Sequence, residues 1–499
     1  MNKYTILIII LLSFLIYGNS LNNEFVSDDI PAIVNNPVLS DLFSRLDPNS
    51  FLYALNYAVA GLNPWIYHVT SIILHIITSI LVFFFLRLFF KQWPSLWGAL
   101  IFTVHPVHTE AVTWISGRGY VLFSLFLLAS FLLYVRATAS SKLRVGDFLG
   151  SFIFFICAVY SATVALLYLG MLVLYDFTFG KWRKNYKYWT VFFAFGIFKV
   201  LSITSLIGQR IAQVSADIGP SGDVNFIFNM AFSVFSHLGL LLWPARLTLY
   251  HENLTVSAPA MGVGVFFLCL LFLLLPILFK KAKVLFFAFM VFILFLSPTY
   301  SPVTITWLVA ERYLYFPSIA LSMGLAFFIE RVSAAGKVKV SGSILLIALL
   351  AAGSVRTVIR NFDWASHASI WRATVRVSPQ SAKAHNNMGD VYCLEGNLEK
   401  AVEEFRRAIE LKADYADAYH NLAHTYQQMG RVKEAVVNYK KAVAINKNLY
   451  QSYRNLGVIY LKEKNFELAE KYFKKVMEIK PGDQQIKQVI DRLAASRRR

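Results

Sequence analysis

Long apolar runs fill most of the first 360 residues, and short polar or basic stretches separate them. A helix needs about 20 mainly apolar residues to cross the hydrocarbon layer of a membrane. The pattern therefore predicts a bundle of membrane helices, some of them short or partial. The candidate segments are 4–18, 65–90, 94–113, 120–136, 148–160, 163–179, 188–207, 225–243, 260–279, 284–298, 315–331 and 341–357.

Residues 361–499 follow another pattern, dense in Lys, Arg, Glu and Asp, with a period of 34 residues. Small residues recur where two helices of a hairpin would touch, and aromatic residues recur between hairpins. This is the pattern of tetratricopeptide repeats, with minor departures such as Ala423 at an expected glycine. Positions in register are Asn387, Asn421 and Asn455; Tyr392, Tyr426 and Tyr460; Ala401, Ala435 and Ala469; and Phe405, Tyr439 and Phe473.

The sequence thus predicts an all-α protein, a polytopic membrane helix bundle followed by a tetratricopeptide α-solenoid. The expected domains are a membrane domain over 1–360, a half-repeat connector over 361–381, three repeats over 382–483, and a capping helix with a basic tail over 484–499. Such a solenoid presents a concave face. We expect that face to bind a protein segment, with self-association as the alternative.

Composition agrees with a membrane protein, because 57% of the residues are hydrophobic and 15% are charged, against about a quarter charged in soluble proteins. The net charge of +19 does not indicate nucleic-acid binding. Many Lys and Arg residues lie in short loops, where they fix membrane orientation, and there is no interleaved patch of aromatic and basic residues. Cys157, Cys269 and Cys393 are not spaced as a metal or redox site.

Basic loops stay on the cytoplasmic side, so the opposite face should receive the loop after the first helix, the turns at 105–118 and 310–317, and the repeats. Segment 225–243 decides the number of spans. We favour a re-entrant segment, with 11 spans in total, because every basic loop then lies on one side of the membrane. If the segment crosses the membrane instead, each loop after it lies on the opposite side. The first apolar run lacks a good cleavage site, so we expect an uncleaved helix.

Asp28 and Asp29 lie in the loop after the first apolar run. Negative charge at a membrane edge is costly unless it is paired or used. The loop that contains them, 18–63, is long, and loops of that length usually have a function. Around 42–43 and 51–53 the loop is expected to form short amphipathic helices in the interface.

A second polar cluster runs from His105-Pro106-Val107-His108-Thr109-Glu110 to Arg118. If the segment stays helical, His105 and His108 share a face. The imidazoles and Arg118 are suited to a lipid phosphate, with Glu110 orienting them. The alternative is a set of polar groups satisfied by loop backbone. A divalent metal held with Asp28 or Asp29 is possible, but two histidines alone are weak grounds for one.

A third cluster, Glu311, Arg312, Tyr313 and Tyr315, stands between apolar runs. The Arg fork suits a phosphate or a carboxylate; the alternative is a Glu–Arg pair within an aromatic belt, and the segment alone does not decide. The isolated histidines His68, His75 and His237 are expected to make helix–helix hydrogen bonds. Lys199, inside an apolar run, is expected to extend its ammonium towards a polar edge.

These motifs resemble, in order and spacing, the transmembrane and tetratricopeptide-repeat-containing O-mannosyltransferases, which are glycosyltransferases of the GT-C class. The resemblance covers nearly the whole chain. It implies transfer of a sugar, mannose, from a polyprenyl-phosphate donor to Ser or Thr of a protein on the non-cytoplasmic face. The residues that carry it are Ser27-Asp28-Asp29, His105 to Glu110 with Gly117-Arg118, Ala310 to Tyr315, and the repeats.

The resemblance also implies roles for individual residues. Asp28 or Asp29 would be the catalytic base, and the anomeric carbon would invert. The donor phosphate would be stabilised by His105, His108, Arg118 and Arg312, with Glu110, Glu311, Tyr313 and Tyr315 in support. The asparagine ladder of the repeats, Asn387, Asn421 and Asn455, would hold the acceptor.

One departure concerns a Ser-Lys-Glu motif that the family usually carries before the sixth span. Here the turn reads Ser161-Ala162-Thr163, without either charge, so donor binding or turnover is expected to differ. Two other functions fit the sequence: a non-enzymatic membrane adaptor, and a polymerase or ligase acting on a lipid-linked glycan. The expected location is the bacterial plasma membrane, with the endoplasmic reticulum as the alternative.

Overall fold

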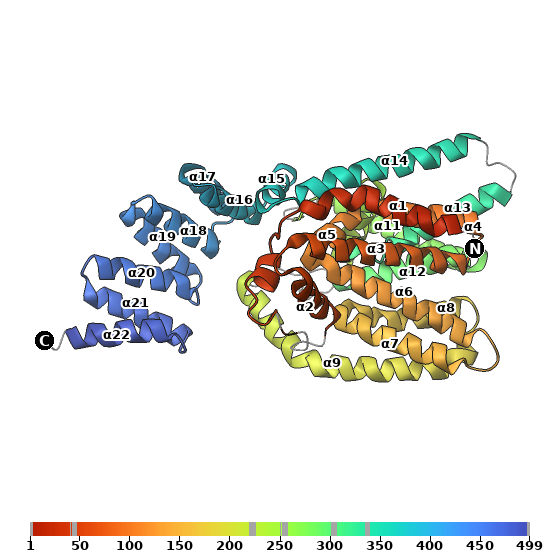
Figure 1. Ribbon diagram of the computed structural model, residues 1–499, viewed down its shortest axis with the longest axis horizontal. Coiled ribbons are helices and arrows are strands. Elements are labelled where there is room, and N and C mark those ends of the chain that lie inside the picture. Colours follow the sequence, from red (N-terminus) through yellow and green to blue (C-terminus); the bar gives the residue numbers. More distant parts are fainter. Residues whose placement is uncertain are drawn as a thin grey trace. The chain divides into compact units, whose positions relative to one another are not determined.

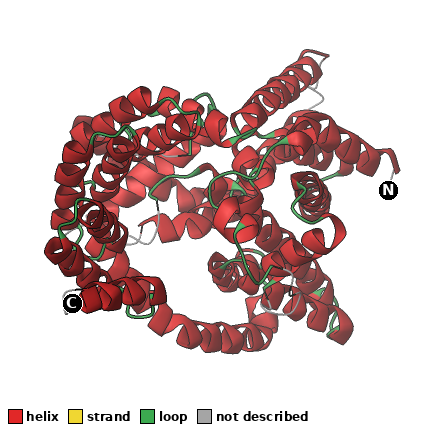
Figure 2. Cartoon of the chain, turned by 60° about the vertical axis from the view of Figure 1, so that its left-hand side comes forward, coloured by secondary structure: helices red, strands yellow, loops and turns green. Residues whose placement is uncertain are grey.

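The computed structural model describes residues 3–39, 41, 47–218, 226–249, 251, 258–300, 307–334 and 340–496. The regular structure of these residues is helical throughout (Figures 1 and 2), so the prediction of an all-α fold is confirmed. The chain divides into two compact units, Met1–Ser369 and Ile370–Arg499, and the division falls within helix α15. The amphipathic segment expected near 42–43 lies outside the described residues.

The first unit contains long apolar helices joined by short 3-10, π and α turns. Its elements are α1 Lys3–Tyr17, η1 Gly18–Asn22, η2 Ile30–Val34, α2 Pro48–Ala60, α3 Pro64–Arg87, α4 Gln92–Val104, η3 Pro106–His108, α5 Thr109–Thr113, η4 Ile115–Gly117, α6 Arg118–Thr138, α7 Val145–Ser161, η5 Thr163–Leu167, α8 Tyr168–Thr178, α9 Trp182–Ile218, α10 Phe226–Leu242, α11 Ala258–Lys281, α12 Lys283–Leu296, η6 Ser297–Tyr300, η7 Glu311–Leu314, α13 Ile319–Ala334 and α14 Val340–Asp363.

Seven stretches among the described residues are long and apolar enough to cross a membrane, and with the shorter apolar helices they make this a multi-pass membrane protein. The stretches are Tyr4–Asn22, Pro64–Arg87, Ile115–Thr138, Trp182–Thr204, Gly262–Lys281, Lys283–Tyr300 and Gly342–Asp363. Segment 225–243 forms α10, one of the shorter apolar helices; whether it crosses stays a prediction.

The candidate span 94–113 is not one continuous helix, because the helix breaks at His105. Helix α4 ends at Val104, and His105 is extended, with φ −68° and ψ 124°. A residue before proline avoids the helical region, so Pro106 forces the break. The chain then turns through η3 and the short α5 before α6 begins. Two helix ends and two tight turns therefore bring the polar residues of 105–118 together.

The short helix predicted around 51–53 is present as α2, and the Asp47 side chain caps it by accepting a hydrogen bond from the Ser50 N–H at 2.9 Å. Its position in the membrane interface stays a prediction. Helix α1 contacts α3, α4 and α14, and α6 contacts α3 and α7. The loop that carries Asp28 and Asp29 therefore leaves the bundle where the ends of α3, α5 and α14 are close.

The second unit is a stack of helical hairpins (Figure 1). Gly389 and Gly457 sit against Phe405 and Phe473, where a Cβ would lie 2.6 Å from the ring, so the first and third hairpins are closed by contact of a bare backbone with an aromatic ring. The helices are α15 His367–Val377, α16 Ala382–Leu394, α17 Leu398–Leu411, α18 Ala416–Gln428, α19 Val432–Ile445, α20 Tyr450–Lys462, α21 Phe466–Ile479 and α22 Gln484–Ser496.

Candidate active site

Asp29 is fully buried, and its carboxylate is held at both oxygens. Oδ1 accepts hydrogen bonds from the backbone N–H of Ser116 at 2.7 Å and from the Ser116 hydroxyl at 2.5 Å. Oδ2 accepts the Val26 N–H at 3.1 Å. Burial raises the pKa of Asp29 to about 6, against the lowering effects of these hydrogen bonds and of the Arg118 charge. Asp29 thus ties the first loop to η4.

Asp28 has a contrasting environment. Its side chain is exposed, and it has no side-chain hydrogen bond or ion pair to the other described residues. Ser27, immediately before it, adopts a left-handed conformation with φ 52°. Backbone strain of this kind at a non-glycine residue is concentrated at functional sites. Of the two adjacent carboxylates, Asp28 is the one whose oxygens are free to accept a proton.

Arg118 is fully buried at the start of α6. Its Nε donates to the Ser71 hydroxyl at 3.2 Å, Nη2 donates to the Tyr67 carbonyl at 3.2 Å, and its guanidinium lies 5.0 Å from the centre of the Tyr53 ring. The remaining nitrogen, Nη1, is buried and has no hydrogen-bond partner among the described residues. An unsatisfied buried donor on a cation favours an anionic ligand.

Arg312 forms a bidentate interaction with Glu110. The Arg312 backbone N–H donates to Glu110 Oε2 at 2.7 Å, and Nη1 pairs with Oε1. The Arg312 side chain is 12% exposed and that of Glu110 only 1%. The rings of Trp114 and Tyr313 lie 5.8 and 5.0 Å from the guanidinium carbon. Glu110 therefore orients Arg312, while part of the guanidinium stays accessible.

Glu311 does not pair with its neighbour Arg312. It accepts a hydrogen bond from Arg360 Nη2 at 3.0 Å, and Arg360 Nη1 pairs with Asp363 at 2.9 Å. Adjacent residues on one turn point in different directions, so each reaches a different distant segment. The alternative of a local Glu–Arg pair at 311–312 is wrong. Arg360 anchors the end of α14 to η7.

These contacts join segments that are far apart in the sequence. The loop with Asp28 and Asp29 is bonded to η4 through Ser116, and the start of α5 is bonded to η7 through Glu110 and Arg312. The 110–118 segment thus gathers two carboxylates, those of Asp29 and Glu110, and two guanidinium groups, those of Arg118 and Arg312. Within the described residues, no group of three or more His, Cys, Asp or Glu side chains is placed to hold a metal ion.

The two histidines of the motif face the interior of the bundle. His105 has both ring nitrogens engaged, with the Leu241 carbonyl at 2.9 Å and the Val107 N–H at 3.4 Å. His108 Nε2 is 2.8 Å from the Ser318 hydroxyl, and its ring packs against that of Tyr315. These contacts fix η3 against α10 and the segment before α13. Direct contact with a donor phosphate stays a prediction for both.

Tyr315 is fully buried, and its hydroxyl is 2.7 Å from His75 Nδ1. The other ring nitrogen, His75 Nε2, is 3.1 Å from the Thr103 carbonyl of α4, and this is the helix–helix bond expected for His75. The ring of Tyr313 lies 5.9 Å from that of Tyr120 on α6 and beside the Arg312 guanidinium. Both tyrosines therefore support the position of η7.

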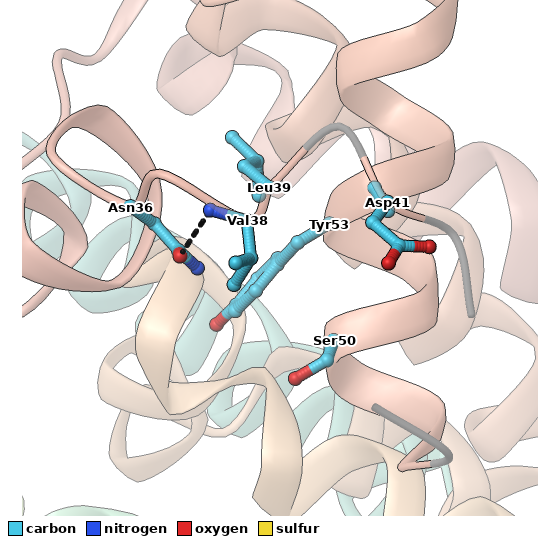
Figure 3. A pocket seen from close by; sticks show the side chains of 7 residues that line it. Asn36, Val38, Leu39, Asp41, Ser50 and Tyr53 are labelled. Carbon is cyan, nitrogen blue, oxygen red and sulfur yellow. Dashed lines mark hydrogen bonds between the residues drawn. The ribbon is translucent and has the colours of Figure 1, made fainter. Parts of the chain in front are cut away.

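A small pocket lies next to Tyr53, the residue whose ring faces Arg118 (Figure 3). The ring of Tyr53 forms one wall of it, and the same residue donates its hydroxyl hydrogen bond to the Ile115 carbonyl at 3.1 Å. Because Tyr53 also faces Arg118, one aromatic ring separates the pocket from the guanidinium. The lining residues are Asn36, Val38, Leu39, Asp41, Ser50, Tyr53 and Ala54.

The asparagine ladder of the repeats is partly buried. Asn421 Nδ2 donates to Asn386 Oδ1 at 3.2 Å, and Asn455 Nδ2 donates to the Tyr439 hydroxyl at 2.8 Å. Asn387 Nδ2 donates within its own helix, to the Lys383 carbonyl at 2.7 Å. Two of the three amides thus link neighbouring helices, and binding of an acceptor by these positions stays a prediction.

Sequence reasoning missed Ser116, Arg360 and Asn361. Asn361 joins three segments: its amide donates to the Ile16 carbonyl at 2.8 Å and to Asn19 at 2.7 Å, and it accepts from the Thr113 hydroxyl at 3.0 Å. A signal was present for Arg360, because a cation directly after the last apolar run suggests a partner. None was present for Ser116, whose role exists only through its contact with Asp29.

Family models described as TPR repeat and tetratricopeptide repeat match residues 389–430 and 414–482, and they confirm the predicted repeats. The crystal structure of MamA covers 28% of this chain and 74% of its own, at 21% identity and a TM-score of 0.25. A TM-score this low does not show that the two proteins share a fold.

The chain as a whole is similar to curated protein O-mannosyl-transferases. It is 26% identical over 463 residues to human TMTC3, and the match covers 80% of this chain and 50% of TMTC3. Identity is 27% to human TMTC1, covering 80% and 54%, and 27% to a protein of Caenorhabditis elegans with the same designation, covering 81% and 62%. The resemblance drawn from the motifs is thereby confirmed. The chain spans about half the length of the human relatives.

Proposed function

We propose that this chain is a GT-C-type membrane glycosyltransferase. It moves mannose from a polyprenyl-phosphate donor to Ser or Thr of a protein acceptor on the non-cytoplasmic face. The similarity to proteins named protein O-mannosyl-transferases supports the sugar and the acceptor. The lipid phosphate donor and the side of the membrane are inferred from buried cations at a bundle edge and from the positive-inside rule.

The proposal depends most on the contrast between Asp28 and Asp29. Asp29 is locked by Ser116 and Val26, whereas Asp28 is exposed and free. We assign the base to Asp28 and the positioning of its loop to Asp29. In the reaction Asp28 accepts the proton of the acceptor hydroxyl, whose oxygen forms a bond to the anomeric carbon. The bond from that carbon to the phosphate oxygen breaks, and its electron pair leaves with the phosphate.

The leaving lipid phosphate gains negative charge as that bond breaks. Arg118, with its unsatisfied Nη1, and Arg312, with its partly exposed fork, are the cations we assign to it. Preorganised donors aimed at developing charge lower the barrier without reorganising during the reaction. Attack from the side opposite the phosphate inverts the anomeric carbon. His105 and His108 act by holding η3, and Glu110 by holding Arg312.

The membrane domain, 1–360, carries out the transfer, and the repeats over 382–483 bind the acceptor protein. The half-repeat connector at 361–381 and the capping helix after 483 complete the solenoid. The repeats lie on the same non-cytoplasmic face as Asp28. We place the protein in the bacterial plasma membrane, with the endoplasmic reticulum membrane as the alternative.

The test compares wild-type chain, Asp28→Asn and Glu24→Gln in cells, with mass spectrometry of peptides from exported proteins. Glu24 is an exposed carboxylate of the same loop and serves as the matched control. Asp28→Asn is expected to lower transfer by at least 100-fold, since removing a general base costs about 10²–10⁴ in rate. Glu24→Gln is expected to leave transfer unchanged.

Transfer that persists in Asp28→Asn and stops in Asp29→Asn would move the base to Asp29. If no mannosylated peptide depends on the wild-type chain, the function is wrong. Loss of a lipid-linked glycan instead of a protein modification would then favour the polymerase or ligase. Unchanged glycans with an altered set of repeat-bound proteins would favour the adaptor.

A further inference from the structure

Lys199 is an ionisable residue inside an apolar helix that the proposed mechanism does not use. It lies in the candidate span Trp182–Thr204, towards the end away from the basic residues at 181–187. A charged side chain within a span is costly unless it is paired or serves a function. Its surroundings therefore need a physical explanation.

Lys199 lies on the face of α9 that packs against other helices. Phe192, Phe195, Gly196 and Lys199 follow the spacing of one helix face. The Phe192 ring is 5.5 Å from that of Phe155 on α7, the Phe195 ring also contacts Phe155, at 5.9 Å, and a Cβ on Gly196 would meet a methyl group of Leu169 on α8 at 2.7 Å. Figure 1 shows α9 running along α7. Lys199 is thus directed towards the end of α7.

The ammonium of Lys199 lies 4.1 Å from the centre of the Tyr160 ring, in the last turn of α7. The Tyr160 side chain is exposed, so the cation lies at an open edge. Among the described residues, no carboxylate forms an ion pair with Lys199. The cation–π contact accounts for its position but leaves its charge without an anion.

The end of α7 also contacts α6, the helix that begins at Arg118. A Cβ on Gly119 would lie 3.5 Å from the Ser161 carbonyl oxygen, so the start of α6 contacts the end of α7. Arg118 is the residue before Gly119, and Tyr160 the residue before Ser161. The Lys199 ammonium therefore lies at the end of α7 that contacts the start of α6.

We propose that Lys199 binds the phosphate of a lipid-linked substrate at this edge, between α6, α7 and α9. An ammonium is a compact point charge suited to a phosphate oxygen, and Tyr160 holds it in place. The inference rests on the proposed function and deepens it by naming a donor-binding residue. The same phosphate chemistry occurs in polyprenyl phosphates and in phospholipid headgroups.

The test measures equilibrium binding of polyprenyl monophosphate to the full chain in lipid nanodiscs, with phosphatidylglycerol as the competing phosphate lipid. The variants are Lys199→Met, Lys199→Arg and, as a matched control in the same helix, Lys187→Met. Loss of one charge-assisted contact is expected to raise the Kd about tenfold or more in Lys199→Met. Lys199→Arg is expected to restore most of the affinity, and Lys187→Met to leave the Kd unchanged.

A wild-type Kd in Lys199→Met overturns the inference, and Asp28-dependent transfer would then leave the proposed function standing. Binding that phosphatidylglycerol displaces equally well also overturns it, because the site would be an ordinary lipid contact. If Lys199→Met lowers the melting temperature and leaves the Kd unchanged, the ammonium stabilises the C-terminal end of α7 and does not bind the phosphate. A wild-type chain that neither binds polyprenyl phosphate nor transfers mannose contradicts both proposals.

Discussion

Asp29 and Ser116 form the contact that attaches the first loop to the central polar segment: one carboxylate oxygen accepts both the backbone N–H and the hydroxyl of Ser116. The two residues are 87 positions apart. Because Asp29 is saturated in this way, we propose its exposed neighbour Asp28 as the catalytic base. The catalytic assignment therefore depends on a contact made by the residue that does not react.

Replacing Ser116 by alanine should weaken that attachment. Asp29 would lose a charge-assisted hydrogen bond, and such bonds contribute about 1.5–3 kcal/mol. We expect a lower melting temperature and lower transfer, with the backbone N–H still holding Oδ1. Thermal unfolding of the full chain measures the change. Ser124→Ala removes a hydroxyl that, within the described part of the chain, bonds only inside its own helix, and it should be nearly neutral. Equal effects of both variants would contradict the role of Ser116.

The pH dependence of stability should report the burial of Asp29. Its folded pKa of about 6 lies above the ordinary value of 3.8, so between about pH 4 and 6 the folded state holds a proton that the unfolded chain has lost. Its contribution to stability is therefore present at about pH 4 and is lost as pH rises through about 6. The melting temperature of wild type should fall across this window relative to Asp29→Asn.

Asp28→Asn is the control for that comparison, because the variant keeps the buried carboxylate. Its melting curve should follow that of wild type at each pH. If the melting temperatures of wild type and Asp29→Asn change in parallel between pH 4 and 7, the pKa of Asp29 is the same in the folded and unfolded chain and the prediction is wrong.

The pair of Glu110 and Arg312 should show strong coupling. Removing one partner of a buried ion pair leaves an uncompensated charge and costs about 3–5 kcal/mol. We expect Arg312→Met to destabilise by that amount, and the double variant with Glu110→Gln to recover much of the loss. A double-mutant cycle of unfolding free energies measures the coupling. Additive losses would show that the two side chains act separately.

The repeats offer a test of packing at Gly457. A Cβ there would lie 2.6 Å from the Phe473 ring, but the equivalent position of the middle repeat is Ala423, packed beside Tyr439 in the same cluster. A single methyl group is thus accommodated when the ring shifts. We expect Gly457→Ala to be mild and Gly457→Val to cost about 1–3 kcal/mol by overpacking.

Hydrogen exchange of α20 and α21 in the full chain would locate the effect of Gly457→Val. Gly482→Ala is the control, since a Cβ at Gly482 meets no atom within 4 Å. Similar exchange in both variants would mean that the hairpin does not depend on this close contact.

The sequence by itself determined the class of the protein, because helix formation, membrane compatibility and the repeat period depend on residues near one another in the chain. The apolar runs predicted the helices of the first unit, and the period of 34 predicted the hairpins of the second. The break at His105 followed from Pro106 in the same local way.

Only the tertiary structure decided which polar groups are satisfied and which are left free. Glu311 and Arg312 are adjacent, yet they pair with Arg360 and Glu110. Asp28 and Asp29 are adjacent and carry the same chemical group, yet one is exposed and the other is locked. Charge and hydrogen-bond partners come from segments separated by up to hundreds of residues, so a local pattern identifies candidate groups while packing selects among them.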